Sequence, residues 1–158
     1  MNRIAVACLL AGALAGLGCA TTVAVREGGP SHPAYLHALA DLRHARAHLE
    51  APAETRRAGW DEGTAIRELG AAIHEIKEAS IKEASIDDGK NLNDHPGVDA
   101  RMDWPGRLHR SLELLRRARH DCAEEEDNGF ARGLRGRAIQ HIDAAIRLTE
   151  DAIRANHW

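Results

Sequence analysis

The chain repeats itself. Residues 65–79 (AIRELGAAIHEIKEA) align without a gap with residues 138–152 (AIQHIDAAIRLTEDA), at an offset of 73. Upstream, residues 42–46 (LRHAR) match residues 115–119 (LRRAR) at the same offset. Farther upstream the offset is 72, which matches Pro33, Leu36 and His37 with Pro105, Leu108 and His109. The repeating unit is predicted to be a helical hairpin that is used twice, so any fold must accommodate two copies of it.

Apolar residues follow a helical period through most of the chain. Ile66, Leu69, Ile73 and Ile76 lie three or four positions apart, which is typical of one apolar helix face. The same spacing predicts helices over 33–50, 61–85, 105–125 and 130–156. Each helix has a single apolar face that must be buried against the others. We therefore predict an all-α protein, an antiparallel four-helix bundle built from two duplicated helical hairpins.

The predicted connections suggest how the helices follow one another. The first repeat covers about 33–86 and the second about 105–156, with a linker over 87–104 that is rich in Asp, Asn, Gly and Pro. The connections within each repeat are short enough for antiparallel hairpins. An up-down-up-down order is favoured. The linker is also long enough for a crossover along the bundle.

The N-terminus has the pattern of an export signal. Arg3 is followed by an uncharged, Ala- and Leu-rich run over 4–20, the order of a secretory signal peptide. The run ends in LAGLGC at Cys19, which resembles the lipobox of bacterial lipoproteins, although Gly16 stands where that motif prefers a branched aliphatic residue. We expect 1–19 to be a signal peptide, Cys19 to be lipidated and 20–32 to tether the bundle (33–158) to the membrane. Cleavage after Ala20 without lipidation is the alternative.

Composition excludes several function classes. The net charge is −3, spread as mixed signs, and the chain has one Phe, one Tyr and three Trp. It therefore lacks the basic patch and the stacking aromatic residues of a nucleic-acid-binding protein. The chain also carries no Ser-His-Asp, phosphate-loop or zinc-protease motif, so we predict that it is not an enzyme. Cys122 is in phase with the leucines before it, which predicts a small buried apolar residue.

Histidines form the strongest candidate site. The segment 33–50 places His37, Asp41, His44 and His48 on one helix face, at a spacing of four, seven and eleven residues. In the second repeat, an offset of 72 aligns these positions with His109, Glu113, Arg116 and His120. Imidazole and carboxylate groups one turn apart can bind Zn, Cu or Ni. The competing interpretation is an ordinary solvated face, since this face points away from the leucines.

These patterns lead to two functional hypotheses. The first is a non-enzymatic interaction or scaffold protein of the bacterial cell envelope, without a cofactor, anchored in the membrane through Cys19 and presenting its helix faces and the 87–104 linker to an envelope protein partner. The second is a divalent-metal binding or buffering protein that uses the helix-face histidines listed above, with Asp41 and Glu113. Periplasmic or envelope localisation follows from the export signal in both cases.

Overall fold

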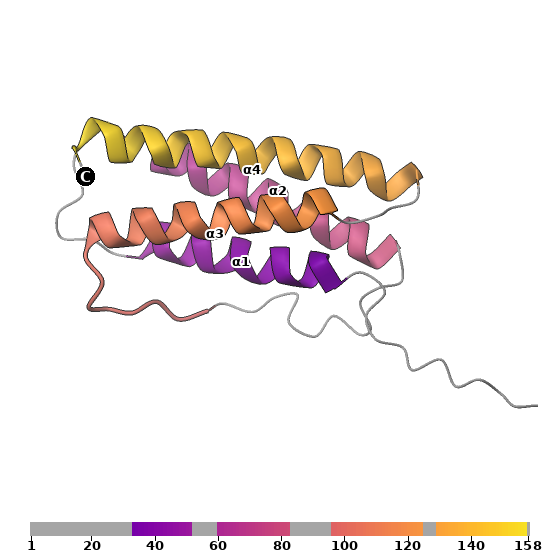
Figure 1. The fold of residues 1–158 in the computed structure, drawn as a ribbon, viewed down its shortest axis with the longest axis horizontal. Helices are drawn as coiled ribbons and strands as arrows, with labels where there is room; N and C mark the ends of the chain where they lie inside the picture. Colours follow the sequence, from indigo (N-terminus) through magenta and orange to yellow (C-terminus); the bar gives the residue numbers. More distant parts are fainter. Residues whose placement is uncertain (1–32, 52–59, 83–95, 125–128, 158) are drawn as a thin grey trace, which may run out of the picture.

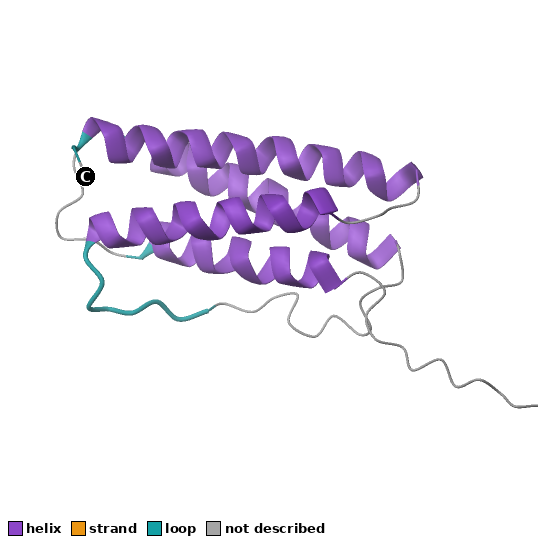
Figure 2. Ribbon diagram, in the orientation of Figure 1, coloured by secondary structure: helices purple, strands orange, loops and turns teal. Residues whose placement is uncertain are grey.

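The structure, a computed structural model, describes residues 33–51, 60–82, 96–124 and 129–157 (Figure 1). Over these residues it contains four helices and no strand (Figure 2). The helices are α1 (Pro33–Glu50), α2 (Glu62–Lys82), α3 (Trp104–Glu124) and α4 (Gly129–Ala155). The predicted four-helix bundle is confirmed. The helix ends lie within a few residues of the ends expected from the apolar spacing.

Local sequence signals account for the helix starts. Asp61 precedes α2, and its Oδ1 accepts a hydrogen bond from the Thr64 backbone N–H at 2.9 Å. Asp103 precedes α3 in the same way and accepts the Gly106 N–H, also at 2.9 Å. Each aspartate therefore satisfies one of the N–H groups that a helix leaves unpaired in its first turn. Pro33 opens α1, where its missing N–H costs nothing.

The helices form a ring in which every neighbouring pair is antiparallel. α1 contacts α2 and α3, and α4 contacts α2 and α3, so α1 lies diagonally from α4 and α2 from α3. Following the colours in Figure 1, α2 and α3 run in the same direction, opposite to α1 and α4. The order along the chain is therefore up-down-down-up. The favoured up-down-up-down order was wrong, and the connection between the repeats joins opposite ends of the bundle.

Two tryptophans connect the helices at one end of the bundle. The indole N–H of Trp60, just before α2, donates to the Leu148 carbonyl in α4 at 3.1 Å. The ring of Trp60 lies 5.3 Å from that of Trp104, the first residue of α3. The starts of α2 and α3 are therefore adjacent, as their shared direction requires.

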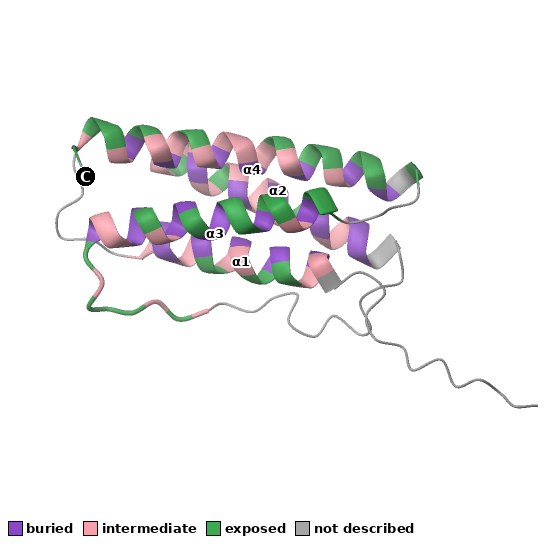
Figure 3. Ribbon diagram, viewed as in Figure 1, coloured by how far each residue is buried: buried purple, intermediate pink, exposed green. Residues whose placement is uncertain are grey.

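All four helices carry buried positions (Figure 3), and many of these hold large apolar side chains. Four groups of fully or almost fully buried residues, one from each helix, meet in the core. They include Tyr35, Leu39, Leu42 and Leu49 of α1, Leu69 and Ile76 of α2, Leu108, Leu114, Leu115 and Cys122 of α3, and Leu134 and Ile142 of α4. Burial of these side chains supplies most of the driving force for folding. Cys122 is fully buried, as its spacing predicted.

The closest helix pairs join the two repeats rather than the two helices of one hairpin. α2 with α4, and α1 with α3, share the most extensive contacts. We call these the α2/α4 seam and the α1/α3 seam. The paired helices bury small residues seven positions apart: Ala65, Ala72 and Ala79 of α2, Ala131, Ala138 and Ala145 of α4, Ala38 and Ala45 of α1, and Ser111 and Ala118 of α3. Small side chains let two helix backbones approach closely, which explains why these pairs dominate.

The buried positions also define how the repeats correspond. Tyr35, Ala38, Leu42, Ala45 and Leu49 of α1 are buried, and adding 73 to each number gives Leu108, Ser111, Leu115, Ala118 and Cys122, all of which are buried in α3. The offset found for α2 and α4 therefore holds throughout the bundle. The offset of 72 near the start of α1 aligns identical residues that do not occupy equivalent positions in the fold. Leu36 is only half-buried, whereas Tyr35 is buried and corresponds to the buried Leu108.

Candidate functional site

The predicted histidine stripe of α1 borders α3. His37 and His44 are exposed, Asp41 is half-buried and His48 is buried. The interpretation of this face as wholly solvated was therefore wrong at its C-terminal end. The stripe follows the outer edge of the α1/α3 seam, because the tight packing of small residues there draws α3 over the flank of α1.

Asp41 is held by an arginine from the other repeat. The Arg117 guanidinium donates through Nε to Oδ2 of Asp41 at 3.0 Å and through Nη2 to Oδ1 at 2.8 Å. This two-pronged geometry occupies both carboxylate oxygens and joins α1 to α3. The Asp41 carboxylate therefore serves as a link between helices, and a metal ion would have to displace Arg117 to use it.

Among the residues that the structure describes, His48 is the one whose side chain has a buried polar atom without a hydrogen-bond partner. It is 7 % exposed, and its buried Nδ1 has no hydrogen-bond partner. Burial lowers the pKa of His48, and the nearby positive charges of Arg110, His44 and Arg107 lower it further. The imidazole is therefore held neutral between cationic neighbours. This environment disfavours protonation of the imidazole.

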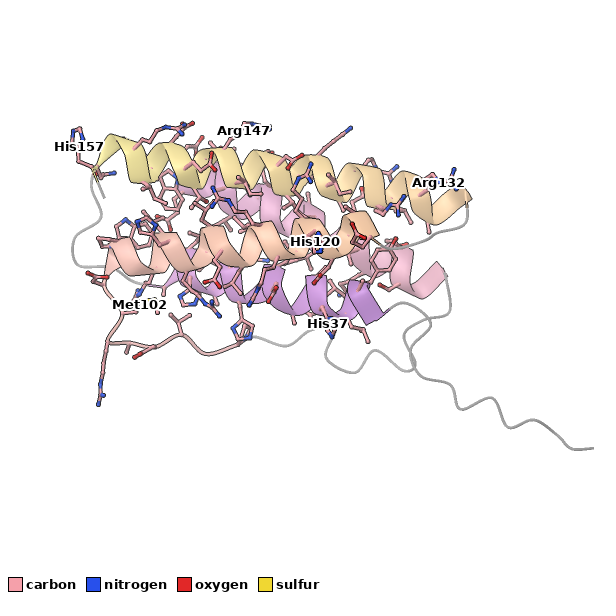
Figure 4. All side chains as sticks on the ribbon, in the orientation of Figure 1. His37, Met102, His120, Arg132, Arg147 and His157 are labelled. Carbon is pink, nitrogen blue, oxygen red and sulfur yellow. The ribbon has the colours of Figure 1, made fainter. Side chains whose placement is uncertain are left out.

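The outer face of α3 carries the other predicted residues. His109, Glu113 and His120 are exposed and line an open surface hollow of about 560 Å³. The hollow is also lined by Leu112, Arg116, Arg117 and Asp121. In Figure 4, His120 on α3 and His37 on α1 lie toward the same end of the bundle. The fold thus brings the two predicted stripes onto neighbouring helices.

Ion pairs fix several side chains around this hollow. Arg110 donates to Glu113 at 2.6 Å, and this hydrogen bond lowers the pKa of the Glu113 carboxyl. Arg116 donates to Glu150 of α4 at 2.8 Å. With Arg117 bound to Asp41, the rim of the hollow is tied to the helices on both sides. The hollow therefore has a mixed-charge lining held in a defined arrangement.

The histidine stripe of α1 does not recur at the equivalent positions of α3. With the offset of 73 that the core obeys, His37 and His44 correspond to Arg110 and Arg117, and His48 corresponds to Asp121. Within the residues that the structure describes, no group of three His, Cys, Asp or Glu side chains is close enough to hold a metal ion.

One contact was missed by the sequence analysis. Nδ1 of His141 lies 2.7 Å from Oε2 of Glu68 across the α2/α4 seam. Nearby, Arg137 makes a two-pronged pair with Glu75, at 2.9 and 2.8 Å. A signal was present, since His141 and Glu68 occupy the same position of the aligned repeats. Only the antiparallel pairing of α2 with α4 makes that position meet its own equivalent.

The predicted signal peptide, the lipidation site Cys19 and the tether lie outside the described residues, as does most of the 87–104 linker. None of the described helices combines the length and the apolar character needed to cross a membrane.

In comparisons with known proteins, the chain matches no protein-family model, no curated protein and no solved structure.

Proposed function

We propose that this protein is an exported, lipid-anchored, non-enzymatic helical bundle that binds a protein partner in the bacterial cell envelope. The observation that carries the proposal is the hollow on α3, whose exposed histidines sit among arginines and carboxylates already fixed by ion pairs. A lining held in place before binding loses little conformational freedom when a partner docks. Its mixed charges favour a polar protein surface over a single small ion.

Export and anchoring are supported by the order of residues at the N-terminus. A basic residue, an apolar run and Cys19 follow one another as in lipoprotein signals. The test is labelling of cells that express the full chain with a radioactive fatty acid. The chain should carry the label and sediment with membranes, and Cys19→Ser should abolish both. An unlabelled, freely soluble wild-type chain would contradict the lipid anchor and favour cleavage after Ala20.

Partner binding is tested with a photo-crosslinking amino acid placed in the hollow. His120 and His109 are the sites of choice, because both are exposed there. Arg147 and Arg132 are exposed on α4 and project away from the hollow, so they provide matched controls (Figure 4). Irradiation of intact cells should give one crosslinked product of defined mass from the hollow and none from the controls. The same products from both faces, or none from the hollow, would contradict the proposal.

Divalent-metal binding is the second candidate. It is supported by His44 and His48, one helical turn apart, and by the unpartnered Nδ1 of His48. Titration of the chain from Thr21 onward with Zn, Cu or Ni should then give one bound ion per chain. Substitution of both histidines by alanine should remove it, and His157→Ala, at an exposed position near the C-terminus, should not. Equal retention in all three proteins would exclude this site.

A further inference from the structure

The α2/α4 seam contains a point of internal two-fold symmetry. Glu68 and His141 are equivalent residues of the two repeats, 73 positions apart, and their side chains meet at 2.7 Å. In an antiparallel pair, a residue meets its own repeat equivalent only where a local two-fold axis crosses the seam. We name α1 with α2 hairpin 1, and α3 with α4 hairpin 2. The two hairpins pack as the subunits of a symmetric dimer would.

The α1/α3 seam shares this axis. The Ser111 hydroxyl donates to the Ala45 carbonyl at 2.7 Å, which sets the level at which α3 crosses α1. Counting three residues from that contact in opposite directions along the two helices brings Leu42 level with Leu114, one residue before its own equivalent Leu115, so the axis crosses the seam close to Leu42 and Leu115. Both are fully buried. The whole contact between the hairpins is therefore one symmetric surface, and each hairpin carries a complete half of it.

Charge distinguishes the two halves. Glu68, Glu75 and Asp41 of hairpin 1 pair with His141, Arg137 and Arg117 of hairpin 2. In each of these pairs the acid comes from hairpin 1 and the base from hairpin 2. If two copies of hairpin 1 met on the same axis, Glu68 would face Glu68. If two copies of hairpin 2 met, His141 would face His141. Two Glu68 carboxylates at such a distance repel each other, and two facing His141 rings each lose the carboxylate that they contact, so pairing of identical halves is disfavoured.

The ends of the hairpins are far apart. Trp104 begins α3 with its ring against Trp60, at the start of α2, whereas hairpin 1 ends at Lys82. The connection from Lys82 to Trp104 therefore spans the length of α2, which is about 30 Å for 21 residues. Residues 83–103 can reach about 70 Å when extended, so they can join hairpins of one chain or of two.

We propose that the contact surface between the hairpins is also a surface for a second copy of this chain. Hairpin 1 of one molecule pairs with hairpin 2 of the other, and the acid-to-base arrangement makes this the only pairing that retains the three ion pairs. The exchanged dimer contains the same seams as the monomer, so its stability differs from that of the monomer mainly through the connection and the protein concentration.

The test shortens the connection in the chain from Thr21 onward. Deletion of residues 83–98 keeps the turn in which the Met102 N–H donates to Asp99 O, and leaves five residues that extend over about 20 Å at most. They cannot bridge the roughly 30 Å between Lys82 and Trp104. Size-exclusion chromatography with light scattering should give a dimer, and circular dichroism should show retained helix. A monomer would overturn the proposal.

Cysteine pairs identify which hairpins meet. Glu68→Cys and His141→Cys are combined in the shortened chain and treated, after folding, with a short thiol-reactive crosslinker. Cys122 is fully buried and is the only other cysteine of this chain. Chains should become linked in pairs by the double variant and stay unlinked in either single variant. Crosslinked dimers of the single variant Glu68→Cys would mean that identical halves meet, and would overturn the proposal.

The intact chain provides a second test that does not depend on the deletion. Full-length chains from Thr21 carrying Glu68→Cys, and longer tagged chains carrying His141→Cys, are unfolded together and refolded at high concentration. Crosslinking should then join tagged to untagged chains. A mixture of tagged and untagged Glu68→Cys chains is the control and should give no such product. Absence of the mixed product at every concentration would overturn the proposal.

Discussion

The α2/α4 seam and the α1/α3 seam lie on opposite sides of the bundle and differ in chemistry. In the α2/α4 seam, alanines face alanines, and Glu68 and Glu75 pair with basic groups of α4. In the α1/α3 seam, Ser111 donates across the contact, and the buried His48 leaves Nδ1 without a partner beside Arg107 and Arg110. One duplicated hairpin has thus produced a seam of simple packing and another that buries ionisable groups.

The two repeats agree more closely in the size of their buried residues than in the charge of the residues beside them. The small residues that let helices approach recur at the offset of 73, because any larger side chain would push the backbones apart in both seams. The flanking residues have no such constraint. Equivalent positions hold Glu68 and His141 in one case and His48 and Asp121 in another, so the two halves differ in charge, and one seam contains an imidazole nitrogen without a hydrogen-bond partner.

A larger side chain in the α2/α4 seam should destabilise the protein most. Ala72→Leu inserts three carbon atoms where two helices touch, and it should lower the free energy of unfolding by about 3 kcal/mol. Urea unfolding followed by circular dichroism measures this loss. Ala123→Leu, at an exposed position of α3, is the control and should change stability by less than about 0.5 kcal/mol. Equal effects would mean that close approach does not define the seam.

The next effect is a pH dependence confined to the α1/α3 seam. The folded pKa of His48 is lowered from 6.5, so the unfolded chain binds more protons in this range and stability rises with pH. The loss should begin as pH falls below about 6.5 and be complete below the folded pKa. Thermal unfolding between pH 5 and 8 should show a flatter profile for His48→Leu than for wild type. The exposed His120→Leu should retain the wild-type slope, and an unchanged slope in His48→Leu would contradict the assignment.

A smaller effect should separate a hydrogen bond across a seam from one within a helix. Ser111→Ala removes the bond from Ser111 to Ala45 O and should cost about 1 kcal/mol. Thr149 donates to Ala145 O of its own helix at 2.9 Å, so Thr149→Val should cost less, because no contact between helices is lost. Chemical unfolding of both variants compares them. A larger loss of stability for Thr149→Val would contradict the expectation that the hydrogen bond between helices contributes more than the one within a helix.

The smallest effect is expected from the exposed ion pairs. Arg137 and Arg117 are 54 % and 49 % exposed, so water and salt screen both pairs. Glu75→Gln and Asp41→Asn should each cost about 0.5 kcal/mol at low salt and less at 1 M salt. Unfolding at two salt concentrations measures this difference. A cost that does not respond to salt would show that packing, and not charge, accounts for the contribution of these residues.

Much of the fold could be predicted from periodicity. The helix ranges, the hairpin repeat and the buried state of Cys122 follow from spacing, because a helix buries one face and spacing decides which residues lie on it. The direction of α3 could not be predicted in this way, since the linker is long enough for either topology. The burial of His48 was missed for a related reason. Spacing placed it opposite the leucines of α1, but α3 covers that flank of the helix.

For the candidate site too, some residues could be identified from the sequence and others only from the packing of the helices. The sequence identified the exposed residues His109, Glu113 and His120, which line the hollow. It did not reveal that the Arg117 guanidinium binds both carboxylate oxygens of Asp41, because these two residues lie 76 positions apart in the sequence. It also suggested a repeated stripe that the core register does not support. A one-residue change of offset moves a side chain by about 100° around a helix, so only packing could decide between 72 and 73.

Two similar helical hairpins with one apolar face each could be predicted from the sequence alone, because hydrophobic periodicity is a local property. The two-fold axis between the hairpins, the shared direction of α2 and α3 and the contact between Glu68 and His141 became visible only once the helices were packed together. These features depend on how closely two helix surfaces can approach. That distance is set by small residues that come from both hairpins and act only once the hairpins are packed together.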